Sequence, residues 1–291
     1  MTNERTILNL TVPGNRQLKA RLCAKASAFG IRHPVLPTVS RPLLRLFVWY
    51  SRRYLQRHFN SLRVARAGAV AIPSGIPVVI YSNHASWWDP LVGLQLANQF
   101  LPGKSVFAPM DAAAVVRYGF FKRLGVFGVE QETRSGAVQF LRTAREVLRN
   151  DNHVLWFTPQ SRFADARERP VQLKPGIGHL PGLAREILFV PVAIEYVFWE
   201  ERLPEILVRF GEHYQTTADV RSVKPARWVE FFADRLRATQ DQLAQAAQRR
   251  DPTELVSVLR GRAGVGGVYD RWRSFNAKRR GETFQPEHGQ L

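Results

Sequence analysis

A histidine and an aspartate five positions apart are the residues of this sequence best suited to chemistry. His84 and Asp89 belong to the stretch Asn83-His84-Ala85-Ser86-Trp87-Trp88-Asp89-Pro90. An apolar run over 77–82 precedes this stretch and predicts a buried strand, and residues 91–96 predict a helix. Ligands bind at strand ends in α/β sheets, and a carboxylate that holds an imidazole prepares it to act as a general base. The stretch therefore predicts a histidine base oriented by Asp89.

Each of these two residues also has an ordinary structural explanation. Asp89 followed by Pro90 is a favourable helix start, with the aspartate as N-cap and the proline in the first turn. His84 could be a hydrogen-bonded loop residue, and the two tryptophans between them could belong to the core. Because two fixed residues match a short pattern by chance, the choice between the explanations depends on the rest of the chain.

Length, charge and cysteine content restrict the class of protein. The 291 residues, 45% of them hydrophobic, suffice for one large α/β domain with a proper core. A single Cys23 excludes an internal disulfide, and the seven histidines show no metal-ligand spacing, so we expect no metal site. The net charge of +18 attracts anions, which include nucleic acid, an anionic membrane surface and anionic substrates.

Short β-rich runs alternate with helical ones along most of the chain. Strands are predicted near 65–71, 77–82, 105–109, 126–130, 153–158, 188–196 and 205–211. Helices are predicted near 90–100, 111–123, 178–186, 226–250 and 253–260, and over 135–149 with Ser135 as its cap. This alternation predicts an α/β fold in which helices flank a mostly parallel central sheet.

The segment 41–59 predicts an amphipathic helix near the N-terminus, with leucines and aromatic residues on one side and arginines on the other. Such a helix packs its apolar stripe on the core of the protein or lies in a membrane interface. The surplus of basic residues favours the membrane. We therefore divide the chain into an arm with this helix over 1–60, a catalytic domain over 61–262 and a basic tail over 263–291.

Three later stretches complete a pattern that begins with the octet at 83–90. They are Gly128-Val129-Glu130-Gln131-Glu132-Thr133-Arg134, Trp156-Phe157-Thr158-Pro159-Gln160-Ser161-Arg162-Phe163 and Val190-Pro191-Val192-Ala193-Ile194. In order and spacing the chain resembles the glycerol-3-phosphate and lysophosphatidate acyltransferase family over roughly residues 75 to 215. The family carries an Asn-His-x-x-x-x-Asp box, a box ending in Arg, a Phe-Pro-Glu-Gly-Thr-Arg-Ser box and a Val-Pro-Val strand. The resemblance implies a glycerolipid acyltransferase-like fold, with His84 and Asp89 as catalytic residues.

The third box departs from the family pattern. Without a gap, Arg162 falls on the family arginine and Pro159 replaces the glutamate; with a shift of one residue, Gln160 and Ser161 take the glutamate and glycine positions. In either alignment the carboxylate is lost, which suggests a reshaped acceptor pocket. The resemblance implies that this loop binds the acceptor phosphate. The expected substrate-binding residues are Arg134, Gln160, Ser161, Arg162 and Lys174.

The resemblance implies an O-acyltransferase of phospholipid biosynthesis. It would move a fatty acyl group from acyl-coenzyme A or acyl-carrier protein, as co-substrate, to the hydroxyl of a lysophospholipid-type acceptor, with no cofactor. The missing carboxylate leaves open a non-phosphate membrane alcohol, such as a lyso-aminolipid or a glycosylated isoprenoid. The alternative outside enzymes is a non-catalytic basic protein that binds membranes or nucleic acid, although no nucleic-acid motif is recognisable and no specific nucleic acid is expected. We expect a peripheral protein on the cytoplasmic face of a membrane.

Overall fold

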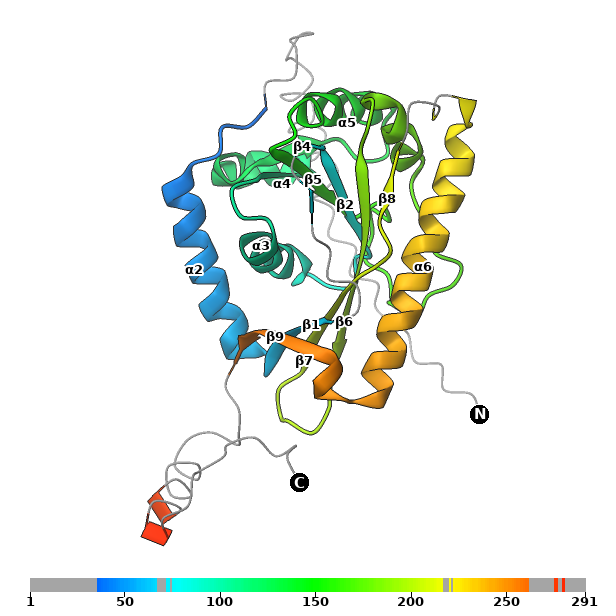
Figure 1. Cartoon of the computed structure of the whole chain (residues 1–291). Helices are drawn as coiled ribbons and strands as arrows, with labels where there is room; N and C mark the ends of the chain where they lie inside the picture. The colour runs from blue at the N-terminus through cyan, green and yellow to red at the C-terminus, as the bar shows by residue number, and fades with distance from the viewer. Residues whose placement is uncertain are drawn as a thin grey trace, which may run out of the picture.

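A nine-stranded mixed sheet forms the centre of the molecule (Figure 1). The computed structural model describes residues 36–66, 72–73, 75–216, 220, 222–261, 275–276 and 279–280. The strand order is β4-β3-β5-β2-β6-β7-β1-β9, and β8 pairs with β6 outside this path. The strands are β1 (Ser61–Ala65), β2 (Val78–Ser82), β3 (Ser105–Asp111), β4 (Val126–Val129), β5 (His153–Phe157), β6 (Leu188–Val197), β7 (Glu205–Phe210), β8 (Tyr214–Gln215) and β9 (Leu255–Arg260).

The half of the sheet from β4 to β6 is parallel, and its carboxyl ends therefore share one edge. Strand β2 lies between β5 and β6 and is parallel to both. All five residues of β2 are buried, as expected for a parallel strand covered on both faces. On the other side of β6, β7 runs antiparallel to it, and β1 and β9 complete the sheet.

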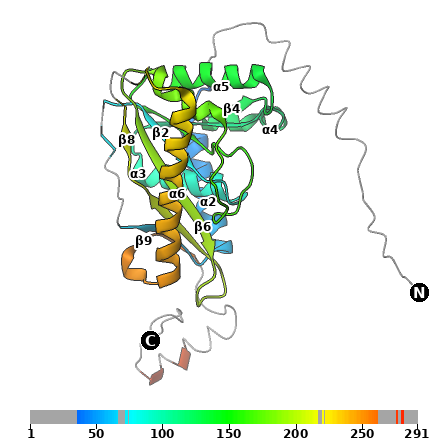
Figure 2. The same cartoon turned by 90° about the vertical axis from the view of Figure 1, so that its right-hand side faces the viewer.

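Helices cover both faces of the sheet (Figure 2). Helices α2 (Arg41–His58) and α3 (Asp89–Phe100) pack against one face, where they share a core with Val78 and Ile80. Helices α5 (Arg134–Val147) and α6 (Pro225–Arg249) and the 3-10 helix η2 (Pro175–Leu183) cover the other face, where they share a core with Val79 and Tyr81. Alternate residues of β2 thus face opposite layers, as the two-residue period of a strand requires.

The predicted fold class, a mostly parallel sheet flanked by helices, is confirmed, and the segment predicted as a helix over 41–59 forms α2. Three helix predictions need correction. The helix predicted near 178–186 is the 3-10 helix η2, Pro175–Leu183. The segment 253–260 is the short 3-10 helix η4 (Pro252–Glu254) followed by β9, because a strand pairing with β1 buries Leu255 and Leu259. The helix predicted over 111–123 is broken at Tyr118 into α4 (Ala112–Arg117) and the 3-10 helix η1 (Gly119–Leu124).

Other differences are smaller. The strand predicted near 65–71 is displaced, because β1 runs from Ser61 to Ala65 and Arg66 lies in a bend. Residues 67–71 lie outside the described residues, as do residues 1–35 and most of the tail over 263–291. Thr133 rather than Ser135 caps α5, because its hydroxyl accepts a hydrogen bond from the Gly136 N–H at 3.0 Å. The Ser135 hydroxyl instead donates to Glu130 at 3.2 Å.

The layer between the sheet and α6 depends on one aromatic side chain. Phe232 is fully buried, and its ring lies 4.5 Å from that of Phe189 and 5.3 Å from that of Tyr81. We expect Phe232→Ala to lower the free energy of unfolding by about 3–5 kcal/mol in urea denaturation, because it leaves a cavity in a close-packed core. The matched control is Phe198→Ala, whose side chain is 68% exposed and which should change stability by less than about 0.5 kcal/mol. Equal effects of the two substitutions would contradict this packing.

Candidate active site

Asn83 fixes the point at which the chain leaves β2. Its side chain is buried, and the side-chain amide makes the pair of hydrogen bonds that a backbone amide makes in a strand. Nδ2 donates to the Ile194 carbonyl at 2.9 Å, and Oδ1 accepts from the Ile194 N–H at 2.8 Å. These bonds continue the pairing of β2 with β6 past Ser82, which lies opposite Val192. The next residue, His84, consequently emerges at a defined position on the carboxyl edge of the sheet.

The backbone of His84 is held by the loop that follows the neighbouring strand β5. The His84 N–H donates to Oε1 of Gln160 at 2.9 Å, and its carbonyl accepts from the Ala164 N–H at 2.8 Å. The sequence predicts Gln160 as a substrate-binding residue, but its side chain is buried and its amide oxygen faces His84. The loop of the third box therefore positions the histidine from the adjacent strand.

The imidazole of His84 and the carboxylate of Asp89 are in direct contact. Nδ1 of His84 lies 2.7 Å from Oδ2 of Asp89. Because the carboxylate accepts a hydrogen bond from the Nδ1–H group, it selects the tautomer in which Nε2 carries a lone pair. Asp89 opens α3, yet its carboxylate makes no N-cap bond to that helix and instead accepts from the Ser86 N–H at 3.0 Å. The ordinary explanation of Asp89 as an N-cap is thus not what the structure shows.

Tyr196 is a third member of this arrangement that the sequence did not identify. Its hydroxyl donates to Oδ1 of Asp89 at 2.6 Å. Burial, followed by the charge of Asp89 and this hydrogen bond, raises the pKa of Tyr196 well above its usual range, so that the phenol remains a donor. Tyr196 lies on β6, the strand that carries the Val-Pro-Val motif, two residues after Ile194 and therefore on the same face of the strand. This two-residue spacing was the signal available in the sequence.

The remaining residues of the third box lie at the surface beside the dyad. The ring of Phe163 is 4.4 Å from the His84 ring and is 58% exposed. Ser161 has a positive φ of 53° and is exposed. Arg162 forms a two-pronged ion pair with Glu168, which raises the pKa of the Arg162 guanidinium. Of these residues, Phe163 alone makes a ring contact with the histidine.

Two further predicted substrate-binding residues lie on the neighbouring loops of the same edge. Lys174 Nζ pairs with Glu132 Oε1 at 2.8 Å, while its backbone N–H donates to the Pro159 carbonyl at 2.8 Å. Arg134 is the exposed first residue of α5. In the described part of the chain, Arg134 has no carboxylate partner, and no three His, Cys, Asp or Glu side chains gather as a metal site would require.

Comparison with known proteins identifies the domain that contains this site. Residues 63–195 match the family model described as Acyltransferase. Over this segment the chain is similar to the acyltransferase family. The matched residues include His84, Asp89 and the loop of the third box, and Tyr196 follows directly after them. The prediction of an acyltransferase is therefore confirmed, in place of the non-catalytic alternative.

A solved structure has a similar arrangement of elements. It is the crystal structure of the 1-acyl-sn-glycerophosphate (LPA) acyltransferase PlsC from Thermotoga maritima, with 15% identity and a TM-score of 0.46. The alignment covers 79% of this acyltransferase and 89% of that chain. No curated protein matches the sequence.

The tyrosine contact can be tested by its effect on the pH dependence of the acyltransferase. We expect Tyr196→Phe to lower kcat about tenfold, because one hydrogen bond to a buried carboxylate is lost. We also expect the acid limb of the pH–rate profile to move to higher pH, since the carboxylate that lacks the phenol attracts the imidazole proton more strongly.

A second tyrosine provides the control for this substitution. The Tyr81 hydroxyl is buried without a hydrogen-bond partner in the described structure, so Tyr81→Phe should leave both kcat and the pH profile unchanged. A Tyr196→Phe enzyme with the parent's pH profile would show that the phenol has no influence on the dyad.

Proposed function

We propose that this acyltransferase moves an acyl group from a thioester donor to the hydroxyl of a lysophospholipid-type acceptor, with His84 as the general base. The contact of 2.7 Å between Nδ1 and Asp89 carries the proposal, because it leaves Nε2 to accept a proton. The acceptor oxygen attacks the thioester carbonyl as its proton moves to Nε2. The tetrahedral intermediate then collapses, and the departing thiolate takes the proton from the imidazolium.

Asp89 stabilises the imidazolium that forms in this reaction. Its charge is buried, and the Ser86 N–H and the Tyr196 hydroxyl hold it in place. Exposed aromatic rings beside His84 suit an acyl chain or a lipid acceptor: Phe163 lies next to the imidazole, and Trp87 is 62% exposed. The donor is proposed to be acyl-coenzyme A or acyl-carrier protein, both of which are anionic and complement a protein with a net charge of +18.

For the acceptor phosphate, Arg134 is the best placed of the predicted residues. It is exposed at the start of α5, where the helix dipole favours an anion, and in the described residues no carboxylate pairs with it. Arg162 and Lys174 would have to leave Glu168 and Glu132 to bind phosphate. These two ion pairs also favour a second candidate acceptor, a non-phosphate membrane alcohol.

An acyl-transfer assay tests both the base and the acceptor. Purified protein would receive labelled acyl-coenzyme A or acyl-carrier protein with lysophosphatidate, a lyso-aminolipid or a glycosylated isoprenoid. We expect His84→Ala to lower the rate with the preferred acceptor by at least about a hundredfold, because the base is removed. His213→Ala, in an exposed loop, should retain the parent rate. Equal rates for the parent and His84→Ala would exclude the imidazole as the base.

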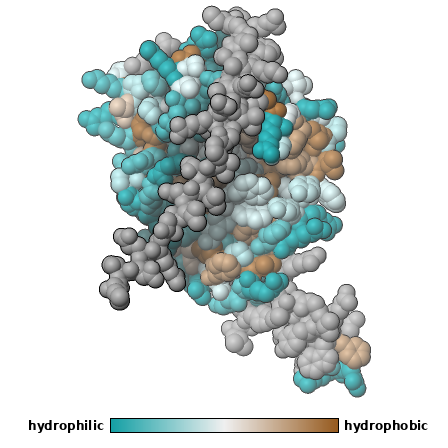
Figure 3. All heavy atoms as spheres, turned by 180° about the vertical axis from the view of Figure 1, so that it is seen from behind, coloured by the Kyte–Doolittle hydropathy of each residue, from teal (hydrophilic) through white to brown (hydrophobic). Residues whose placement is uncertain are grey.

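We further propose that α2 holds the enzyme peripherally on the cytoplasmic face of a membrane. Leu46, Trp49 and Tyr50 on this helix are 59%, 57% and 49% exposed. Apolar side chains reach the surface on the right-hand side of the view from behind (Figure 3), which corresponds to the left-hand side of Figure 1, where α2 lies. None of the helices in the described ranges is long and apolar enough to cross a bilayer.

Aromatic rings extend this exposed surface of α2 in both directions. Phe47 lies 5.9 Å from Phe120 of η1, and Tyr54 lies 6.5 Å from Trp87 beside the dyad, both measured between ring centroids. Exposed basic residues border the aromatic rings: Arg45, Arg52, Arg53, Arg57, Arg117, Lys122 and Arg123. Aromatic rings with basic neighbours suit the interface of an anionic leaflet.

A vesicle-binding experiment tests the proposed membrane surface. We expect the double variant Trp49→Ala and Tyr50→Ala to bind vesicles that contain anionic phospholipid at least about tenfold more weakly, because two interfacial anchors are removed. Its rate with a short-chain acceptor in solution should equal the parent's, since neither side chain contacts the dyad. Phe198→Ala removes an equally exposed ring elsewhere and should not alter binding. Unchanged binding of the double variant would contradict docking through α2.

A further inference from the structure

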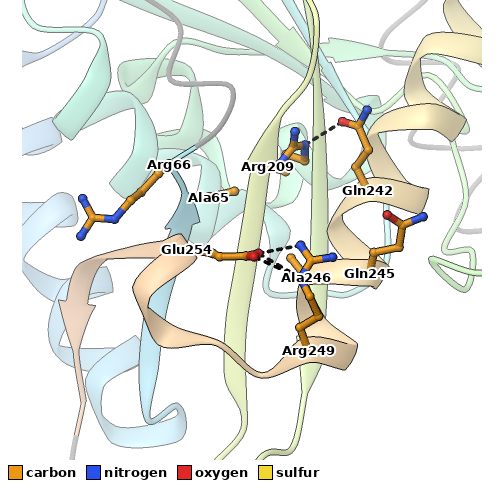
Figure 4. Close-up of a pocket in the computed structure, with 8 residues that line it drawn as sticks. All are labelled: Ala65, Arg66, Arg209, Gln242, Gln245, Ala246, Arg249 and Glu254. Atoms are coloured by element: carbon orange, nitrogen blue, oxygen red, sulfur yellow. Dashed lines mark hydrogen bonds and ion pairs between the residues drawn. The ribbon is translucent and has the colours of Figure 1, made fainter.

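A pocket rich in arginine lies on the face of the sheet opposite the dyad (Figure 4). It encloses about 450 Å³ between the end of β1, strand β7 and the last turns of α6. Tyr196 and Asp89 belong to the layer that α2 and α3 cover, whereas Arg209 in this pocket bonds to Gln242 of α6. The pocket is therefore separate from the proposed catalytic site.

Arg66, Arg209 and Arg249 line this pocket with a single carboxylate, that of Glu254, and Figure 4 shows the guanidinium of Arg66 pointing away from the other two. Glu254 already forms a two-pronged pair with Arg249, with Nη2 to Oε2 at 2.6 Å. Nε of Arg66 donates to the Thr253 carbonyl at 2.8 Å. In the described structure Arg209 pairs with no carboxylate, so the pocket retains the positive charge of Arg209.

Arg209 carries the least compensated positive charge of this pocket. It is partly buried, and its Nε donates to the neutral amide oxygen of Gln242 at 2.8 Å. Burial, together with the charge of Arg249, lowers the pKa of the Arg209 guanidinium. An anion between the two arginines would relieve both effects.

The surroundings of Arg209 supply directed donors as well as charge. Gln242, Gln245 and Arg249 follow one another on one side of α6, and Figure 4 shows Arg209 of β7 directed at Gln242 and Arg249 directed at Glu254. Guanidinium groups match the oxygen geometry of phosphate, and side-chain amides add neutral donors. The volume also exceeds that of a bare phosphate and falls within the usual range of small-molecule sites.

We propose that this pocket binds a phosphate monoester. Two sources share this chemistry. One is the 3′-phosphate of a coenzyme A donor, and the other is a free phosphate or a phosphorylated headgroup. The assignment does not depend on the acyl-transfer chemistry at His84.

Calorimetric titration of the full chain tests the pocket and distinguishes the sources. The probes are inorganic phosphate, coenzyme A and dephospho-coenzyme A at physiological ionic strength. We expect Arg209→Gln to weaken phosphate binding about tenfold, because one charge-assisted contact is lost. The control Arg227→Gln, exposed at the far end of α6, should bind as the parent does. His84→Ala should also bind inorganic phosphate as the parent does, which separates this site from the dyad.

Comparison of the two nucleotides identifies the source. Coenzyme A binding at least about tenfold more tightly than dephospho-coenzyme A, in an Arg209-dependent manner, assigns the site to the donor's 3′-phosphate. Equal binding of the two, with Arg209-dependent binding of inorganic phosphate, assigns it to a free phosphate or another ester. The proposal is overturned if Arg209→Gln binds all three probes as the parent does, or if the parent binds none.

Thermal unfolding shows whether the variant has merely lost its fold. Without ligand, Arg209→Gln should melt at the parent's temperature or above it, since the substitution removes a charge that burial disfavours. Added phosphate should raise the melting temperature of the parent and of Arg227→Gln, but not that of Arg209→Gln. An equal rise in all three proteins would also contradict the proposal.

Discussion

The buried carboxylate of Asp89 is the constraint on which the site depends. A charge removed from water is costly unless hydrogen bonds compensate for the lost solvation. Asp89 receives three: from the His84 ring, the Ser86 N–H and the Tyr196 hydroxyl. The first two come from the loop after β2, and the third comes from β6. The chemistry therefore depends on the register between these strands, which the Asn83 side chain extends to Ile194. A slip of one residue would turn Tyr196 to the other face of the sheet.

The loop of the third box shows how a departure from a family pattern can leave the dyad intact. What the His84 backbone needs from this loop is an acceptor oxygen, and Gln160 supplies one through a neutral amide. The change in the third box thus affects the position of His84 before it affects the acceptor. A charged side chain at the same buried place would require further compensation. The substitution therefore changes the electrostatics beside the imidazole more than it changes the hydrogen bond itself.

Much of the fold could be predicted from the sequence, because buried parallel strands such as β2 and β6 are continuous apolar runs. The prediction failed at 253–260, where the decisive partner β1 lies almost two hundred residues earlier in the chain and no local pattern reveals it. The same reason explains the omission of Tyr196, whose role depends on a contact across 107 positions. Arg162 and Lys174 could be identified as basic residues of the right loops. Their pairing with Glu168 and Glu132 was invisible, since ion pairs depend on how the loops fold.

The aromatic rings of α2 and the carboxylate of Asp89 belong to one packed body. Between ring centroids, Tyr54 of α2 lies 5.3 Å from Trp88, Trp88 lies 4.9 Å from Phe59, and Phe59 lies 5.6 Å from Tyr196. This row of rings joins the exposed helix to the phenol that holds Asp89. Because close-packed rings move little relative to one another, a membrane that fixed the orientation of α2 would also fix the orientation of His84. A lipid acceptor lying in the same interface would then meet the base without a rearrangement of the domain.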